Sequence, residues 1–135
     1  MNADEAAFLD TNILIRHLTG DPSDQAARAT RYLAEAHTLL LTDLILAEVA
    51  YVLESVYETP PAMVATSLRA ILGFPAIRVT DADLLQRAVE VYDVNRLDFA
   101  EAYLVASAER SGIGVVASAE RSIDRVGTIR RLEPA

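Results

Sequence analysis

An α/β fold with a parallel sheet covered by helices on both faces is predicted by three features of the sequence. Short apolar runs alternate along the chain with longer segments of helical periodicity. The runs are apolar throughout, as in strands that are buried on both faces. Polar residues that favour helix starts follow several of these runs, which is the strand-helix order of a parallel sheet. No Gly/Ser linker or internal repeat interrupts the pattern, so we expect one domain over residues 1–135.

The predicted elements follow one another with clear boundary signals. Asp10-Thr11-Asn12 is a polar turn between the first strand and the first helix. Asp21-Pro22 predicts an N-cap followed by proline at the first helical position, Thr42-Asp43 caps a long helix, and Pro60-Pro61 opens another. Strands are predicted at 6–9, 39–41, 77–79, 114–117 and 129–132, and helices from 13, over 21–36, 43–57 and 60–73, from 80, and over 98–110.

The composition excludes several classes of protein. The chain has no cysteine, which rules out disulfides and thiolate zinc sites. No apolar run approaches the ~20 residues of a membrane span. The acidic start, Met1 to Glu5, lacks the basic region of a signal peptide. We therefore expect a cytoplasmic protein that does not engage a membrane.

The net charge of −8 argues against nucleic acid as a partner, because phosphate is repelled by an acidic surface. All twelve basic residues are arginine, however, and arginine pairs phosphate with two parallel hydrogen bonds. A divalent cation would also cancel part of the acidic excess. Nucleic acid therefore stays open as a substrate.

Two acidic residues follow predicted strands, where α/β folds place their ligand sites. Asp10 comes directly after the first strand, and Glu120 follows Val115-Val116-Ala117 together with Ser118. Asp10 has an alternative role as the N-cap of the next helix, and Glu120 as an ordinary loop residue. If the two strands are neighbours, both carboxylates reach the same edge of the sheet.

Three further acids are candidates because of their places in helices. Glu48 falls on or beside the predicted buried face of its helix, where an unpaired carboxylate is costly unless an arginine or a cation compensates it. Glu101 is the only charged residue between Phe99 and Ala108. Asp98 and Glu101 have the spacing of a capping box, and the same spacing lets them share an ion. Asp10, Glu48, Asp98, Glu101 and Glu120 would then form one acidic pocket for Mg²⁺ or, as a substitute, Mn²⁺.

Four segments in this order resemble the PIN-domain family, and specifically the VapC type of toxin ribonuclease. Phe8 to Leu14 resembles the opening motif, Thr42 to Glu48 the helix of the second acid, and Leu97 to Ala106 that of the third. Ser118 through Pro134 resembles the closing segment. The third and fourth acids of the family are usually aspartates, whereas the sequence has Glu101 and Glu120. Which of Asp98, Glu101 and Glu120 would ligate the metal directly is left open.

The resemblance implies a three-layer α/β/α sandwich with a central parallel sheet, assembled as a homodimer. It implies a Mg²⁺-dependent endoribonuclease, the toxin of a toxin–antitoxin pair, with a cognate antitoxin whose tail enters the active-site groove. The catalytic residues would be Asp10, Glu48, Asp98, Glu101 and Glu120, of which Asp10, Glu101, Asp98 and Glu48 would bind metal. Thr11, Asn12 and Ser118 would support the site.

The expected reaction is hydrolysis of an RNA phosphodiester by a water that the metal activates. Glu48 or Asp98 would accept the proton of this water, and Arg96 and Arg121 would hold phosphate. His17 and His37 are interpreted as structural or surface residues. A receiver domain and an aspartate-nucleophile phosphatase both need a lysine, which the chain lacks. The remaining alternative is a non-catalytic PIN-like interaction module.

Overall fold

The computed structural model describes residues 5–135 and divides the chain into two compact units. The N-terminal unit extends to Thr80, and the C-terminal unit comprises Asp81–Ala135. Residues 1–4 lie outside the described part, and with them most of the acidic start that argued against a signal peptide. The expectation that residues 1–135 form one domain stays a prediction. No helix of the described chain is long and apolar enough to cross a membrane.

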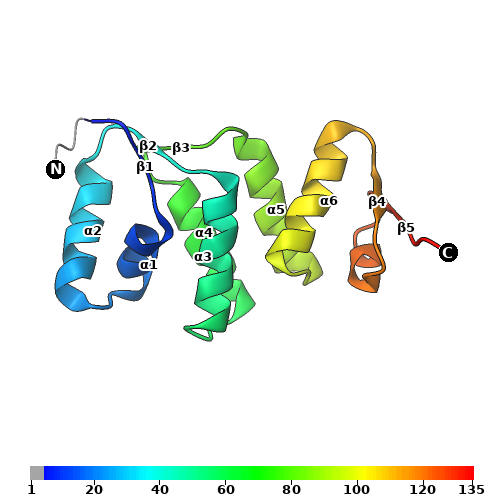
Figure 1. Cartoon of the computed structure of the whole chain (residues 1–135), viewed down its shortest axis with the longest axis horizontal. Helices are drawn as coiled ribbons and strands as arrows, with labels where there is room; N and C mark the ends of the chain where they lie inside the picture. The colour runs from blue at the N-terminus through cyan, green and yellow to red at the C-terminus, as the bar shows by residue number, and fades with distance from the viewer. Residues whose placement is uncertain (1–4) are drawn as a thin grey trace. The chain divides into compact units, whose positions relative to one another are not determined.

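The N-terminal unit is built on a parallel three-stranded sheet. Its strands are β1 (Ala7–Phe8), β2 (Leu39–Leu40) and β3 (Ile77–Arg78), in that spatial order. Ala7 pairs with Leu39, and Leu39 pairs with Ile77, so the three strands run in register. Figure 1 shows the strands together at one end of the four helices α1–α4. The carboxyl ends of all three strands therefore meet at one edge.

Four helices connect these strands: α1 (Thr11–Thr19), α2 (Ser23–Glu35), α3 (Asp43–Ser55) and α4 (Pro61–Leu72). The Thr42 hydroxyl accepts a hydrogen bond of 3.2 Å from the amide of Ile45, which satisfies one free donor at the start of α3. The predicted cap at Asp21 is wrong by one residue. The Pro22 carbonyl accepts from the Ala26 amide at 2.8 Å, so Pro22 itself is the N-cap of α2.

The core of this unit lies between the helices and the sheet. Its largest fully buried side chains come from α1, α2, β2, α3 and α4, and burying each such side chain contributes about 1.5–3 kcal/mol. They are Leu14, Leu33, Leu39, Leu46, Val49, Val64, Leu68 and Ile71. The apolar periodicity of the sequence thus marks the faces on which the helices pack.

The C-terminal unit pairs two helices with a second parallel sheet. Helices α5 (Ala82–Asn95) and α6 (Phe99–Ser111) lie side by side in Figure 1 and bury Tyr92 against Phe99, with ring centroids 6.0 Å apart. Strand β4 (Val115–Ala117) pairs with β5 (Arg130–Leu132) in parallel. A short 3-10 helix, η1 (Arg121–Arg125), connects them and was not predicted.

The predicted α/β class with parallel strands is confirmed, including the last strand near residue 130. The strands fall into two sheets, one in each unit. The helix starts predicted at Thr42-Asp43, at Pro60-Pro61 and near residue 80 are also confirmed, the last with Asp81 as the N-cap of α5. These starts depend on contacts within one turn, which is why the sequence alone predicts them.

Candidate functional site

Asp10 lies where β1 passes into α1, at the carboxyl edge of the first sheet. It is the N-cap of α1, and its Oδ1 accepts a hydrogen bond of 2.8 Å from the amide of Thr11. The capping interpretation of Asp10 is therefore confirmed. Within the described chain this is the only hydrogen bond that the exposed carboxylate makes, so Oδ2 remains open to a ligand.

Thr11 and Asn12 follow in the first turn of α1. Thr11 is 7% exposed, and its Oγ1 is buried without a hydrogen-bond partner among residues 5–135. Leaving a buried hydroxyl unsatisfied costs about 1–3 kcal/mol, so such an atom calls for a water or ligand nearby. Asn12 is exposed. Asp10 is thus followed by the Thr11 hydroxyl, which has no hydrogen-bond partner among the described residues, and by Asn12, which is exposed to solvent.

Two hollows open beside the end of β1. One has a volume of about 390 Å³ and is bounded by Asp10, Ile13 and Tyr32 together with Glu5 to Leu9. The other, of about 300 Å³, lies along the segments that follow β2 and β3 and includes Thr42 and Thr80. Phe8 lines both and is 71% exposed. Asp10 is therefore accessible from a cavity large enough for a small polar ligand.

Glu48 was expected on or beside the buried face of its helix, and the structure does not bury it. The side chain is exposed on α3, on a face where Leu44 is 76% and Tyr51 68% exposed. The buried residues of the helix are Leu46, Val49, Ala50 and Leu53. Because α3 is apolar nearly all round, its sequence pattern alone does not decide which stripe packs inward. Glu48 keeps an open carboxylate but not the burial that first marked it.

Asp98 and Glu101 behave as half of the predicted capping box. Asp98 is the N-cap of α6, and its Oδ1 accepts from the amide of Glu101 at 2.8 Å. The Glu101 carboxylate instead accepts a hydrogen bond of 3.1 Å from the hydroxyl of Ser122 in η1. Glu101 is half-buried, whereas Asp98 is exposed. Although Glu101 is the only charged residue from Phe99 to Ala108, this part of α6 is not buried on every face, since Leu104 is 46% exposed.

Ser122 is a polar residue of this region that the sequence analysis missed. It lies two residues after Glu120, inside the segment whose resemblance had been noted, but its hydroxyl meets a side chain 21 residues away. Its position after an acidic residue in a closing motif was the available signal. The bond brings η1 to the N-terminal turn of α6.

Glu120 and Ser118 shape the turn after β4. The Ser118 hydroxyl accepts from the Glu120 amide at 2.9 Å, and the Ser118 carbonyl accepts from Nη1 of Arg131 at 2.9 Å. Arg131 also pairs with Asp124 at 3.0 Å, which lowers the pKa of that carboxyl. Glu120 itself is exposed at the N-cap of η1. Ser118 thus stabilises the turn before Glu120, and its role as a support of the functional site stays a prediction.

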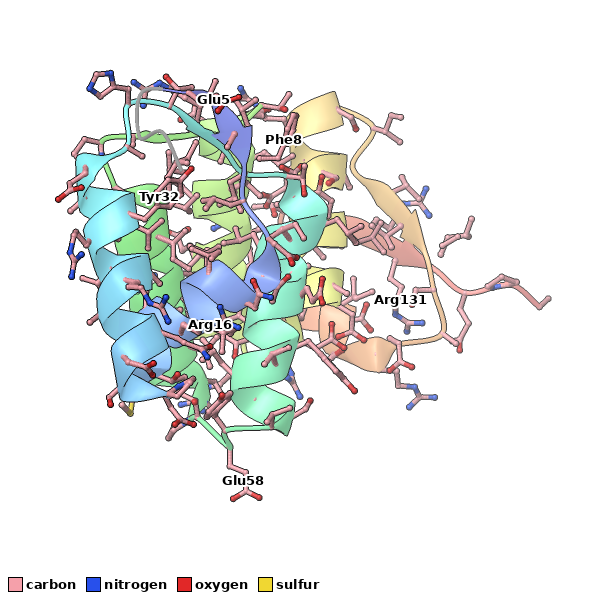
Figure 2. The ribbon with its side chains drawn as sticks, turned by 60° about the vertical axis from the view of Figure 1, so that its left-hand side comes forward. Glu5, Phe8, Arg16, Tyr32, Glu58 and Arg131 are labelled. Carbon is pink, nitrogen blue, oxygen red and sulfur yellow. The ribbon has the colours of Figure 1, made fainter. Side chains whose placement is uncertain are left out.

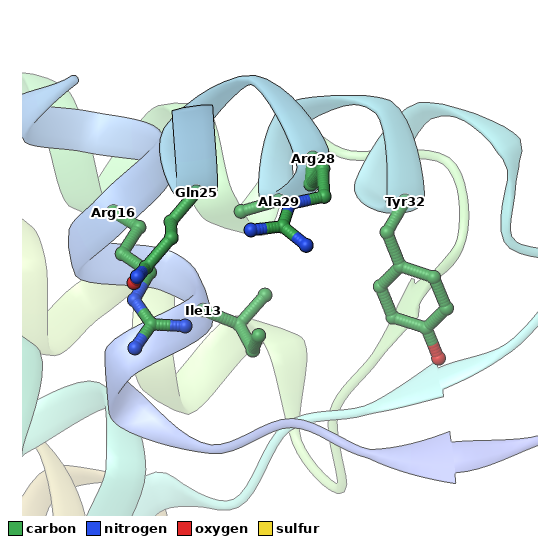
Figure 3. Close-up of a pocket in the computed structure, with 6 residues that line it drawn as sticks. All are labelled: Ile13, Arg16, Gln25, Arg28, Ala29 and Tyr32. Carbon is green, nitrogen blue, oxygen red and sulfur yellow. The ribbon is translucent and has the colours of Figure 1, made fainter. Parts of the chain in front are cut away.

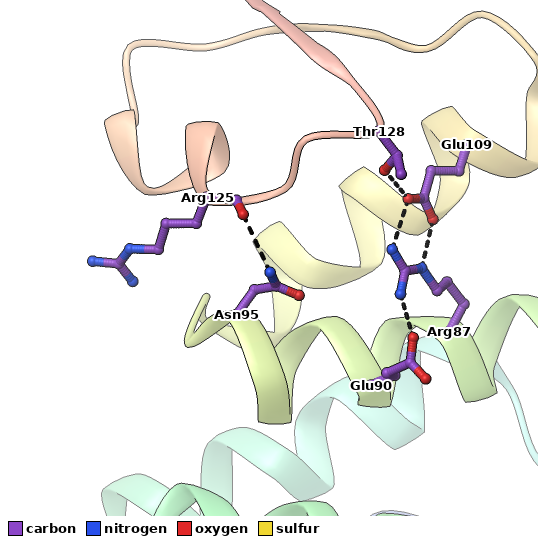
Figure 4. Close-up of polar contacts among 6 residues, drawn as sticks. All are labelled: Arg87, Glu90, Asn95, Glu109, Arg125 and Thr128. Carbon is purple, nitrogen blue, oxygen red and sulfur yellow. Dashed lines mark hydrogen bonds and ion pairs between the residues drawn. The ribbon is translucent and has the colours of Figure 1, made fainter.

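A clamp centred on Arg87 fastens α6 and the segment before β5 to α5. Arg87 donates to Glu109 at 2.8 and 2.9 Å and also to Glu90, and the Thr128 hydroxyl donates to Glu109 (Figure 4). The Arg87 guanidinium lowers the pKa of Glu109 and is itself held in its charged form.

A second connection holds η1 to the end of α5. The side-chain amide of Asn95 donates to the Arg125 carbonyl at 3.2 Å, and Arg125 donates to the Arg96 carbonyl at 2.8 Å (Figure 4 shows the first of these). The side chains of Arg96 and Arg121, predicted to bind phosphate, are exposed. Arg96 ends α5 in the left-handed region, with φ 62°. RNA binding by these arginines stays a prediction.

Each of the two units brings some of the predicted site residues together. Asp10, Thr11 and Asn12 adjoin in the N-terminal unit. In the C-terminal unit Asp98 is bonded to Glu101 and Ser118 to Glu120, and the Ser122 hydroxyl connects Glu101 to the helix that follows Glu120. Among residues 5–135, no three His, Asp or Glu side chains gather closely enough to hold a metal ion. A pocket that combines all five acids stays a prediction.

Comparison with known proteins defines the class. A sequence model of the PIN domain matches residues 7–129, which spans both units. The chain belongs to the PIN domain family, and its fold is the α/β fold of that family, as predicted.

A structure of VapBC2 from Rickettsia felis, bound to a DNA fragment from its promoter, is similar at 14% identity with a TM-score of 0.39. The alignment covers 97% of this chain and 100% of that one. A similarity this low says nothing about function. No curated protein matches the sequence.

Proposed function

We propose that this protein is a divalent-cation-dependent endoribonuclease of the VapC type, the toxin of a toxin–antitoxin pair. PIN domains are typically nucleases and generally use divalent metal ions. The observation that carries the proposal is Asp10, an exposed carboxylate at the carboxyl end of β1, beside a hollow of about 390 Å³. The same aspartate opens the segment that resembles the family's first motif.

The residues around Asp10 fit a hard cation. Carboxylate, amide and hydroxyl oxygens are the donors that Mg²⁺ and Mn²⁺ prefer, and Asp10, Asn12 and the unsatisfied Thr11 hydroxyl supply all three kinds. Asp10 would hold the ion through Oδ2, since Oδ1 is engaged by the Thr11 amide. When bound, such a cation neutralises charge on the phosphate and makes water a better nucleophile.

The other acids have distinct tasks in this proposal. Glu101, oriented by Ser122, would be the second residue to hold the cation. Glu48 makes no hydrogen bond within the described residues, so its whole carboxylate is open to accept a proton from the attacking water. Asp98 has one oxygen occupied as a cap, which makes it the weaker candidate for the base. Glu120 would complete the acidic site.

The partners follow from the resemblance to VapC. We propose RNA as substrate, a cognate antitoxin as inhibitor and a homodimer as the assembly. The acidic charge of −8 requires that phosphate be held by local arginines and by the cation, since the chain as a whole repels RNA.

The test is cleavage of single-stranded RNA by the full chain and by Asp10→Asn. The wild type should cleave in Mg²⁺ or Mn²⁺, stop in EDTA, and leave a 5′-phosphate and a 3′-hydroxyl. Asp10→Asn keeps the capping oxygen and should lose at least about a hundredfold in kcat. Its circular dichroism and melting curve report whether it still folds.

Wild-type rates in the folded Asp10→Asn variant would refute the assignment of Asp10. A folded wild-type protein that binds neither Mn²⁺ nor RNA would favour the alternative, a non-catalytic interaction module.

A further inference from the structure

A third cavity of the N-terminal unit adjoins the one that contains Asp10. It lies between α1 and α2, has a volume of about 380 Å³ and is lined by Ile13, Arg16, Gln25, Arg28, Ala29 and Tyr32 (Figure 3). Ile13 and Tyr32 also line the hollow of Asp10. The two cavities therefore adjoin at these two residues, and the one between α1 and α2 is a groove beside the hollow of Asp10. We call it the α1–α2 groove.

Two arginines supply the charge of this groove. Figure 3 shows the guanidinium groups of Arg16 and Arg28 directed into the same hollow from facing helices. Arg16 has no carboxylate partner in the described part of the chain, and Arg28 reaches Asp24 only at 3.7 Å, with both side chains more than two-thirds exposed. An exposed pair of this length contributes little and exchanges readily for another anion.

Three other arginines form close ion pairs within the protein. Arg87, Arg110 and Arg131 each pair with carboxylates at 3.0 Å or less. In a chain of net charge −8, open guanidinium groups near a candidate catalytic carboxylate are the groups that can attract phosphate locally.

The geometry of α1 relates these arginines to the reaction. Arg16 lies six residues after Asp10, which corresponds to about 9 Å along the helix axis. The half-buried Tyr32 lines both hollows, and Figure 2 shows it between Arg16 and the segment of Glu5 and Phe8. An aromatic ring beside arginines is the usual platform for an unpaired base. Gln25 adds an amide that can bind a base edge.

We infer that the α1–α2 groove binds single-stranded RNA, with Arg16 and Arg28 on backbone phosphates and a base stacked on Tyr32. The inference rests on the proposed ribonuclease function and extends it, because it assigns the path of the strand away from Asp10. An acidic peptide could use the same arginines, but the two residues that the groove shares with the hollow of Asp10 place it beside the candidate catalytic carboxylate, which favours the substrate.

The test measures RNA affinity separately from cleavage. Asp10→Asn is used as the background, and binding of a short fluorescein-labelled single-stranded RNA is followed by anisotropy over a range of salt concentrations. Arg16→Gln and Arg28→Gln should each weaken binding about tenfold. Each should also reduce the slope of log affinity against log salt by about 0.7. The matched control is Arg31→Gln, an exposed arginine of α2 that lines neither hollow and should leave both quantities unchanged.

Tyr32 separates stacking from charge. Tyr32→Leu keeps an apolar side chain without the ring and should weaken binding at least about fivefold, with no change in the salt slope. Tyr32→Phe keeps the ring and should bind as the parent does. Melting curves of all variants establish that they fold.

Equal affinities for Arg16→Gln, Arg28→Gln and Arg31→Gln would overturn the inference. It would also be overturned if the arginine variants lost only a poly-glutamate probe and kept RNA, since the groove would then be a peptide site. Cleavage by the otherwise wild-type chain is assayed in parallel. Cleavage with an unchanged KM in the groove variants would refute the groove as an RNA site and leave the proposed ribonuclease function unaffected. RNA binding that depends on the two arginines, without any cleavage, would support the groove and refute the ribonuclease function.

Discussion

The hydroxyl of Ser122 donates a hydrogen bond of 3.1 Å to Oε2 of Glu101, and the amide of Glu101 donates one of 2.8 Å to Asp98. The two acids of this helix start therefore have different roles. Asp98 serves the backbone as a cap, whereas the carboxylate of Glu101 is oriented by a side chain from η1. Supporting hydrogen bonds of this kind orient carboxylates that bind metals.

We predict that Glu101→Gln costs more activity than Asp98→Asn. Glu101→Gln removes a charge from the oriented position and should lower kcat at least about a hundredfold. Asp98→Asn keeps a capping oxygen and should lower it by less than about tenfold. Ser122→Ala, which only releases the Glu101 carboxylate, should fall between them at about tenfold. Single-turnover cleavage in Mg²⁺ measures all three, and a larger loss in Asp98→Asn would reverse the assignment.

Replacing Arg96 by glycine should increase stability and weaken RNA binding. It ends α5 at φ 62°, where a residue with a Cβ is strained by about 1 kcal/mol. Arg96→Gly should relieve this strain and increase the free energy of unfolding by about 1 kcal/mol, while RNA binding weakens through loss of the charge. Urea denaturation and RNA anisotropy measure the two effects. Arg96→Ala is the control, since it loses the charge but keeps the strain, and a stability gain in it would contradict the argument.

The clamp around Arg87 predicts which acid of α5 and α6 matters for stability. Glu109 is 18% exposed and holds both Arg87 and Thr128, so Glu109→Gln should destabilise the fold by about 1–3 kcal/mol. Glu90 pairs with the same arginine but is 56% exposed, and Glu90→Gln should cost no more than about 1 kcal/mol. Chemical denaturation of the two variants decides, and equal losses would refute the ranking.

His17 predicts a loss of stability in mild acid. Its Nδ1 lies 2.7 Å from the Thr30 hydroxyl, its ring packs edge-on against Phe74, and burial lowers its pKa from 6.5. The folded state then binds the proton less tightly than the unfolded state. The stability is fully present above pH 6.5 and falls as the pH drops through the lower pKa of the folded state.

The melting temperature should accordingly decrease between pH 7.5 and 5.5, and His17→Gln should reduce this decrease. The carboxylates with lowered pKa values, Asp81, Glu109 and Asp124, lose their contributions only below the ordinary values of 3.8 to 4.5. We therefore attribute the expected decrease of the melting temperature above pH 5 to His17. The same slope in wild type and variant would exclude this explanation.

A divalent cation should raise the melting temperature beyond the effect of ionic strength. A ligand that binds only the folded state stabilises it by about 2.7 kcal/mol at a hundredfold excess over its Kd. Thermal melts with Mn²⁺, against NaCl at matched ionic strength, should show a specific shift in wild type and a smaller one in Asp10→Asn. If millimolar Mn²⁺ did not raise the melting temperature more than NaCl does, the folded protein would have no preformed metal site.

The sequence alone predicted the α/β class, the order of the strands and helices, and most of the helix starts. Thr42 and Asp81 illustrate why, since each caps an amide three residues away and therefore depends on local geometry only. The position of Asp10 at the edge of the sheet was also predictable from local sequence. A polar residue directly after an apolar strand lies at the sheet edge, whichever strands are its neighbours.

The tertiary structure decided which side chains those elements bury and which distant groups they meet. Glu48 is exposed because packing chose the stripe of Leu46, Val49 and Leu53, although the apolar pattern of α3 allows more than one choice. Ser122 meets Glu101 over 21 residues, and Arg87 meets Glu109 over 22. Such contacts depend on how helices and loops pack in three dimensions, and no spacing along the chain encodes them.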